Sequence, residues 1–272
     1  MKRNNNKIAI GRLLLTLCML SFAQVLPLQA AITLEIPKAS QQYYELRVYH
    51  LKSAEQKKVV EDYLRTAAIP ALNKLGISPI GVFDKPDQKD GLQLYVFIPY
   101  KSLEQFTQTP AKLLADATYQ TAAAPYLNAV HTEPAYERIE STLMKAFKDM
   151  PALKVPTTTV PKKQRVYEYR SYESFSEKSG LKKIEMFNEG GEIKIFDKLG
   201  FNAVFYAQAI TGSQLPNLAY MTTFDSQESK DQHWAAFGND PDWKRISALP
   251  EYQNTVSKAH IHLLTPTDYS QI

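Results

Sequence analysis

The sequence predicts an α+β protein made of two tandem copies of one β-α-β-β-α-β unit. The stretch YELRVY at residues 44–49 recurs as YEYRSY at residues 167–172, an offset of 123 residues. Two further anchors recur at an offset of 124, namely Leu75-Gly76 with Leu199-Gly200 and Ser102 with Ser226. A nearly constant spacing with a shared order of elements indicates an internal repeat. Each unit has the element order of the split βαβ, or ferredoxin-like, arrangement.

Local patterns justify each element of the first unit, residues 43–147. Alternating apolar and polar residues from Tyr43 predict a strand. Ser53 with Gln56 three residues later forms a capping box for the next helix. That helix bends at Pro70 and ends at Gly76, a C-terminal stop signal. The later elements are a hairpin at residues 77–84 and 92–100, helical pieces over 102–127 and a closing strand at 136–147.

The second unit, residues 165–272, repeats this order after a linker. Residues 148–164 contain three prolines and three threonines, which is a composition typical of a linker. The expected elements are a strand at 165–172, a helix over 175–199, hairpin strands at 201–210 and 217–224, helix over 226–249 and a final strand at 258–266. Gly190-Gly191 within the first of these helices marks either a break or a close helix contact.

The first thirty residues have the pattern of a secretory signal peptide. Lys2, Arg3, Lys7 and Arg12 precede an apolar stretch of fourteen residues, and PLQA follows it as a small-residue exit. A membrane span needs about 20 apolar residues, so an uncleaved anchor is the weaker alternative. A lipoprotein signal at Cys18 is a third reading, although Leu17 before it is not small. We expect export to the periplasm or the outside of a bacterium by a Sec-type signal, with residues 31–42 as a tether.

Removal of the signal peptide makes the chain electrically neutral. Four of the 32 Lys and Arg residues lie in residues 1–30, which leaves 28 against 28 Asp and Glu. The basic pI therefore gives no indication of nucleic-acid or acidic-membrane binding. Cys18 is the only cysteine, so the mature chain has no disulfide and no thiolate metal site. We expect no metal and no cofactor, and as partners a small-molecule ligand and a further copy of the chain.

The repeated hexapeptide places charged residues within a strand. We expect the apolar set Tyr44, Leu46 and Val48 to face the helices. The opposite face then carries Glu45, Arg47 and Tyr49, with Glu168, Arg170 and Tyr172 in the second copy. Helices cover only one face of each four-stranded sheet, so the two open faces can close on each other. The prediction is an intrachain, pseudo-dimeric α/β barrel whose interior is lined by the two Glu-Arg pairs.

These features resemble the NIPSNAP family of the dimeric α/β-barrel superfamily. The resemblance rests on Tyr44–Tyr49 and its copy, on the Leu-Gly end of each first helix and on the stretch WAAFGNDPDWK at residues 234–244. It covers residues 43–145 and 165–265, and the second half is the closer match. The first half has QFTQTPAKLLAD where the second has its two tryptophans, so a site that rests on Trp234 and Trp243 exists only once. The resemblance implies a fold and no settled reaction.

The candidate ligand-binding residues are Glu45, Arg47, Tyr49, Glu168, Arg170, Tyr172, His260 and His262. His260 and His262 lie two residues apart on one strand, so both point to the same face and could reach the cavity of Arg170. Cross-strand pairing that only fixes the register is the more ordinary explanation of the Glu-Arg pairs. Trp234 and Trp243 are expected in the core.

Three functions stay open from the sequence. The first is a cofactor-free protein that binds or transforms a small polar molecule in the barrel interior. The second is a non-catalytic interaction module of the envelope, which predicts a filled barrel. The third is a barrel that handles haem or aromatic compounds.

Overall fold

The computed structural model describes residues 40–272, and the first half builds its sheet around its opening strand. β1 (Tyr43–Leu51) pairs antiparallel with β3 (Leu92–Tyr100) and β4 (Arg138–Ala146), and β3 pairs with β2 (Gly81–Asp84). The helical segments are α1 (Ala54–Tyr63), a π-helical stretch (Leu64–Ala68), α2 (Ile69–Lys74), α3 (Leu103–Leu114) and α4 (Ala117–Leu127). Ser53 and Ser102 cap α1 and α3 as the sequence indicates.

The second half repeats this order of strands and helices. The elements are β5 (Val166–Glu173), α5 (Glu177–Asn188), α6 (Glu192–Lys198), β6 (Asn202–Thr211), β7 (Asn217–Phe224), α7 (Gln227–Asn239), α8 (Pro241–Ser247) and β8 (Lys258–Pro266). The predicted break is confirmed, because α5 and α6 are separated at Gly190-Gly191. Gly191 has a φ of 91°, a left-handed conformation that favours glycine. Asp240 caps α8 ahead of Pro241, as an Asp-Pro pair at the start of a helix predicts.

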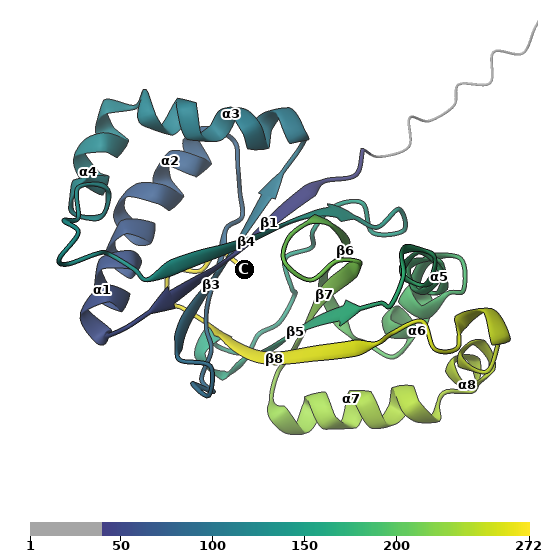
Figure 1. The fold of residues 1–272 in the computed structure, drawn as a ribbon. Helices are drawn as coiled ribbons and strands as arrows, with labels where there is room; N and C mark the ends of the chain where they lie inside the picture. Colours follow the sequence, from purple (N-terminus) through teal and green to yellow (C-terminus); the bar gives the residue numbers. More distant parts are fainter. Residues whose placement is uncertain (1–39) are drawn as a thin grey trace, which may run out of the picture. The chain divides into compact units, whose positions relative to one another are not determined.

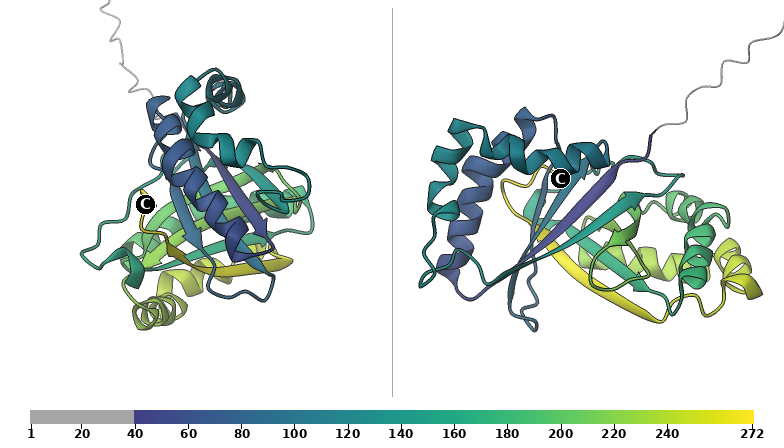
Figure 2. Two further views of the ribbon diagram at one scale, coloured as in Figure 1. Left: turned by 90° about the vertical axis from the view of Figure 1, so that its left-hand side faces the viewer. Right: turned by 45° about the horizontal axis from the view of Figure 1, so that its top comes forward.

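Two seams join the halves into a closed barrel of eight antiparallel strands. The order around the barrel is β1-β3-β2-β8-β5-β7-β6-β4, and β4 returns to β1. β2 pairs with β8 through only two residue pairs, and β4 pairs with β6 through four. Figure 1 shows the strands crossing between the two groups of helices, and Figure 2 shows each group covering its own side of the barrel. The predicted intrachain α/β barrel is therefore confirmed.

The predicted assignment of the sheet faces is wrong. Tyr44 and Leu46 lie in a core shared by both halves, with Phe97, Tyr167 and Phe205 among its members. Val48 packs against the same core, which fills the barrel interior. Tyr49 instead lies in the separate core beneath the helices of the first half. Since strand residues alternate between faces, Glu45 and Arg47 point toward the helices as well.

The second copy follows the same inverted pattern. The indole of Trp234, on α7, donates a hydrogen bond to Glu168, which places Glu168 and Arg170 beneath the helices. Tyr167 and Tyr169 belong to the interior core. The physical reason is pairing, because an ion pair with hydrogen bonds is far cheaper to bury than a lone charge. The barrel interior is enclosed by strands on every side and takes the more apolar face.

Several features of the sequence analysis lie outside the described residues. These are the predicted signal peptide at residues 1–30, with Cys18, and the tether up to residue 39, all of which stay predictions. Within residues 40–272, no helix is both long and apolar enough to span a membrane.

Candidate functional site

The barrel interior does not offer the ligand cavity that the sequence predicted. Six of its aromatic side chains are 0% exposed or nearly so and pack ring against ring, as Tyr44 does on Phe97 and Phe205. A cavity of about 30 Å³ remains where the β6–β7 hairpin meets Thr142 and Tyr169. That volume is near the size of one water molecule, so it cannot hold a substrate.

His260 and His262 do not share a face with Arg170. In the β5–β8 ladder, Ser171 lies opposite His260 and Tyr169 opposite His262, whereas Arg170 lies opposite Ile261. The ring of His262 stacks beside Tyr169 at 6.1 Å between centroids. Burial, and then the charges of Lys85 and His260, lowers the pKa of His262 below its ordinary value. The prediction that both histidines share the sheet face of Arg170 is wrong, although His262 lines a surface groove together with Glu168 and Arg170.

The strand ends carry one His-Glu pair from each half. His260 Nε2 lies 2.5 Å from Glu173 Oε1, and His50 Nε2 lies 3.0 Å from Glu140 Oε1. The positions of histidine and glutamate are reversed between the halves: the histidine lies on the first strand of the first half and on the last strand of the second half. Within the described residues, no three His, Cys, Asp or Glu side chains group as a metal site.

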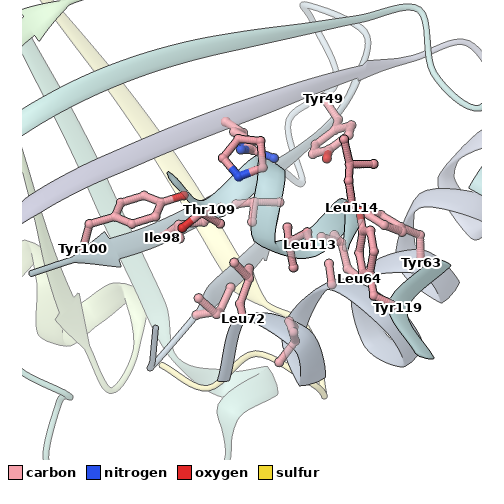
Figure 3. Close-up of a pocket in the computed structure, with 16 residues that line it drawn as sticks. Tyr49, Tyr63, Leu64, Leu72, Ile98, Tyr100, Thr109, Leu113, Leu114 and Tyr119 are labelled. Atoms are coloured by element: carbon pink, nitrogen blue, oxygen red, sulfur yellow. The ribbon is translucent and has the colours of Figure 1, made fainter. Parts of the chain in front are cut away.

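A pocket of about 220 Å³ lies in the first half, between the sheet and its covering helices. Figure 3 shows tyrosines and leucines from different elements around this space. Its lining comes from β1, β3 and the helices: Arg47, Tyr49, Tyr63, Leu64, Ala68, Ile69, Leu72, Ile80, Val96, Ile98, Tyr100, Thr109, Pro110, Leu113, Leu114 and Tyr119. Pro110 and Leu114 are exposed, so the pocket opens to solvent beside α3. The site is therefore mostly apolar, with arginine and tyrosine as its polar groups.

Arg47 is held at the pocket by a two-pronged contact with Glu45. Its Nε donates to Glu45 Oε1 at 2.7 Å and its Nη2 donates to Oε2 at 3.0 Å. Ser141 Oγ donates to Oε1 and Tyr100 Oη donates to Oε2, at 2.8 and 3.1 Å. Burial alone lowers the pKa of Arg47, but the charge and hydrogen bonds of Glu45, with nearby tyrosines, raise it above its ordinary value. The guanidinium of Arg47 therefore keeps its positive charge and forms an ion pair with Glu45.

A tyrosine cluster forms the far wall of the pocket. The hydroxyls of Tyr63 and Tyr119 lie 3.0 Å apart, and Tyr126 Oη donates to Tyr49 Oη at 3.3 Å. The rings of Tyr63 and Tyr126 stack at 3.8 Å between centroids. Burial raises the pKa of Tyr49, Tyr63 and Tyr100 above the ordinary value of tyrosine, so these hydroxyls keep their protons at neutral pH.

In the second half, an indole ring occupies the corresponding place. The guanidinium of Arg170 lies 3.6 Å from the centroid of Trp234, and Trp234 Nε1 donates to Glu168 Oε2 at 2.6 Å. Trp234 also packs edge-on against Phe196, Phe201 and Phe237. The expectation that the tryptophans are core residues is confirmed in part, since both are half-buried and pack against the buried cluster of this half.

Four wall positions on the helices around the pocket have a larger Phe or Trp counterpart at an offset of 124. The correspondence is fixed by the helix caps, because Ser102 and Asp116 cap α3 and α4 just as Ser226 and Asp240 cap α7 and α8. The four pairs are Leu72 with Phe196, Pro110 with Trp234, Leu113 with Phe237, and Tyr119 with Trp243. The pocket exists in the first half because its side chains are smaller there.

A second, wider groove follows the β2–β8 seam. It measures about 740 Å³ and is lined by the hairpin loop with Lys85 and Asp90, by α7 and by β8, with Arg170 and His262 both at its margin. Its charges are already matched, because Lys85 pairs with Asp90 and Arg170 with Glu168. This makes it a weaker candidate than the helix-covered pocket, where Arg47 has an uncovered side.

The family model described as NIPSNAP matches this chain twice, over residues 44–151 and 167–271. The chain belongs to the NIPSNAP family. Its two NIPSNAP segments coincide with the two halves of the barrel, so the internal repeat is a tandem pair of family units. The pocket lies in the first NIPSNAP segment and the aromatic filling in the second. No curated protein matches the chain in sequence.

Two solved structures share the barrel fold of this NIPSNAP protein. A candidate monooxygenase from Fusobacterium nucleatum has a TM-score of 0.55 at 9% identity and covers 84% of this chain and 93% of its own. A candidate monooxygenase from Lactobacillus acidophilus has the same score at 10% identity, covering 84% and 94%. A NIPSNAP family protein from Agrobacterium tumefaciens is 22% identical over 42% of this chain and 95% of its own, with a TM-score of 0.33. At these identities the likeness shows the fold alone.

Sequence reasoning identified Arg47 and Tyr49 but missed most of the pocket. The apolar walls, such as Leu72 and Leu113, have the composition of ordinary core residues. The useful signal was the replacement of Trp234 by Pro110 within the repeat, which was interpreted only as placing a site in the second half. In the structure, the absence of the indole is what opens the space.

Proposed function

We propose that the first NIPSNAP unit binds a small, uncharged and mostly apolar molecule in the pocket beneath its helices. The observation that carries this proposal is the 220 Å³ space beside Arg47, at a place that Trp234 fills in the second unit. Protein interiors are normally packed with few voids larger than a water molecule. A repeat that keeps the order of its elements, has smaller wall side chains and lacks the filling indole leaves room for a ligand.

The volume limits the size of the molecule. An engineered apolar cavity of about 150 Å³ binds benzene, and pockets for drug-sized ligands begin near 300 Å³. At about 220 Å³, the pocket suits a molecule of one or two small rings. Such a molecule can enter beside the exposed Pro110 and Leu114.

The electrostatics favour an uncharged molecule. Glu45 and Arg47 neutralise each other, and the buried tyrosines keep their protons. A charged ligand would lose its hydration without gaining an unpaired counter-charge, which is unfavourable. Hydroxyl groups and the remaining guanidinium N–H supply hydrogen bonds to a polar end of the molecule.

Binding is better supported than catalysis. The lining contains no His, Asp, Glu, Lys or Cys, and general acid–base catalysis needs a group that titrates near the working pH. The monooxygenase activity suggested for two neighbours of this fold is an analogy at the level of the fold. The proposed role is therefore a small-molecule binding protein, without a committed reaction.

The test is to fill the pocket with the side chain that the second half uses. The probe is a library of neutral fragments with one or two rings, and ligand-observed NMR measures their binding to the protein. We expect Pro110→Trp to abolish this binding. The control is Lys112→Trp, because Lys112 is exposed on the same helix and does not line the pocket. Fragment binding that survives Pro110→Trp unchanged, or that is absent from the wild type, would contradict the proposal.

A further inference from the structure

In the second half, the side chain of Trp234 occupies the place that a ligand would take in the first half. The indole of Trp234 lies flat against Arg170, with 3.6 Å between the guanidinium carbon and the ring centroid. Its N–H donates to Glu168 Oε2 at 2.6 Å, while Arg170 Nη2 donates to Oε1 of the same carboxylate at 3.0 Å. The Glu-Arg pair therefore binds an aromatic ring through a stacking face and a single hydrogen-bond acceptor.

The first half presents the same receptor without the ring. Glu45 and Arg47 correspond to Glu168 and Arg170, and Pro110 stands where Trp234 would begin. Among residues 40–272, no aromatic ring stacks on the guanidinium of Arg47, and 30% of the Arg47 side chain is exposed. The uncovered side of Arg47 lines the pocket.

From this correspondence we infer that the pocket takes a planar aromatic molecule that carries one N–H or O–H donor, such as an indole or a phenol. Its ring stacks on the guanidinium of Arg47, as the Trp234 ring does on Arg170. This inference rests on the proposed function, because it names the class of molecule for the same pocket.

Tyr100 shifts the position of the polar contact. The two oxygens of Glu45 already accept four hydrogen bonds, from Arg47 twice, Ser141 and Tyr100, which is the capacity of a carboxylate. The residue that corresponds to Tyr100 is Phe224, which leaves Glu168 free for the indole. In the first half, the donor of the ligand therefore meets the hydroxyl oxygen of Tyr100, which donates to Glu45 and can still accept.

The experiment compares matched probes on the wild-type protein by isothermal titration calorimetry. Phenol against cyclohexanol tests the ring, because both carry one hydroxyl on a six-membered ring. Indole against benzofuran tests the donor, because the oxygen analogue lacks the N–H. We expect phenol to bind on the order of tenfold more tightly than cyclohexanol, which is within the range of a cation–π contact. We expect indole to bind more tightly than benzofuran.

The outcomes separate this inference from the proposed function. The wild-type protein could bind phenol and cyclohexanol equally well and lose both in the Pro110→Trp variant. That result would overturn the inference that the ligand is aromatic and would leave the proposed small-molecule binding intact. If neither phenol nor cyclohexanol binds and no fragment binds in the NMR screen, both this inference and the proposed function are overturned.

Tyr100→Phe supplies the second variant. It recreates the arrangement around Glu168, so the carboxylate of Glu45 accepts directly from the ligand. The preference for indole over benzofuran should rise at least threefold in this variant. A preference that stays unchanged or falls would contradict the proposed position of the donor.

Discussion

The two halves of the barrel share a backbone frame and differ in what fills the layer between sheet and helices. In the second half this layer is aromatic, with Phe196, Tyr206, Tyr220 and Phe237 stacked on one another. The corresponding residues of the first half are Leu72, Val82, Val96 and Leu113. The difference teaches that side-chain volume decides which copy of a repeated fold carries a cavity.

The largest effect should come from emptying the filled half. Trp234→Ala removes an indole from the aromatic cluster and leaves Glu168 Oε2 without its donor. We expect a loss of about 3 kcal/mol in the free energy of unfolding, from the cost of large-to-small core substitutions. Urea denaturation measures it, with Pro110→Ala as the matched control, which should change stability by less than about 1 kcal/mol. Similar losses in the two variants would contradict the contrast between the halves.

An intermediate effect should come from a buried ion pair that only the second half has. Lys183 Nζ lies 2.7 Å from Glu192 Oε2, and their side chains are 7% and 3% exposed. The first half has Val60 and Ala68 at these positions. Since Glu192→Gln leaves a buried lysine without its counter-charge, we expect a loss of about 2–3 kcal/mol, somewhat below the usual cost because glutamine still accepts a hydrogen bond.

Two controls sharpen this result, again by urea denaturation. Glu189→Gln weakens the exposed pair with Lys148 and should destabilise the protein far less than Glu192→Gln does. Lys183→Met combined with Glu192→Leu replaces the pair by apolar side chains and should recover most of the loss. A double variant that is as unstable as Glu192→Gln would contradict the account.

The smallest effect concerns pH. Burial, with the charges of Lys85 and His260, lowers the pKa of His262 below 6.5, although Asp87 and Asp90 oppose this. The unfolded chain therefore binds the proton first as the pH falls below 6.5, and the free energy of unfolding falls with it. The corresponding residue of the first half is Thr142, which does not titrate. We expect His262→Thr to flatten the stability slope between pH 7.5 and 5.5, and an unchanged slope would contradict this.

Much of the fold could be predicted from local patterns. The caps at Ser53, Ser102 and Asp240 and the break at Gly190-Gly191 depend only on nearby residues, and all four occur as expected. The strand over residues 258–266 also matches its predicted bounds. The candidate site was predicted only in part, because Arg47 and Tyr49 line it whereas His260 and His262 lie elsewhere.

The sequence by itself determined the repeat, the order of elements and therefore the closure of two half-covered sheets into one barrel. These follow from periodicity and capping, which act over a few residues. Only the tertiary structure decided which face of each strand turned inward and which half kept an open pocket. The alternation of apolar and polar residues shows that a strand has two different faces, but it does not show which face points into the barrel. A cavity depends on the summed volumes of side chains from segments that are distant in the sequence. Whether a ring of the chain itself can cover the arginine depends on a residue far along the sequence, because Pro110, 63 residues after Arg47, stands where the second half has Trp234.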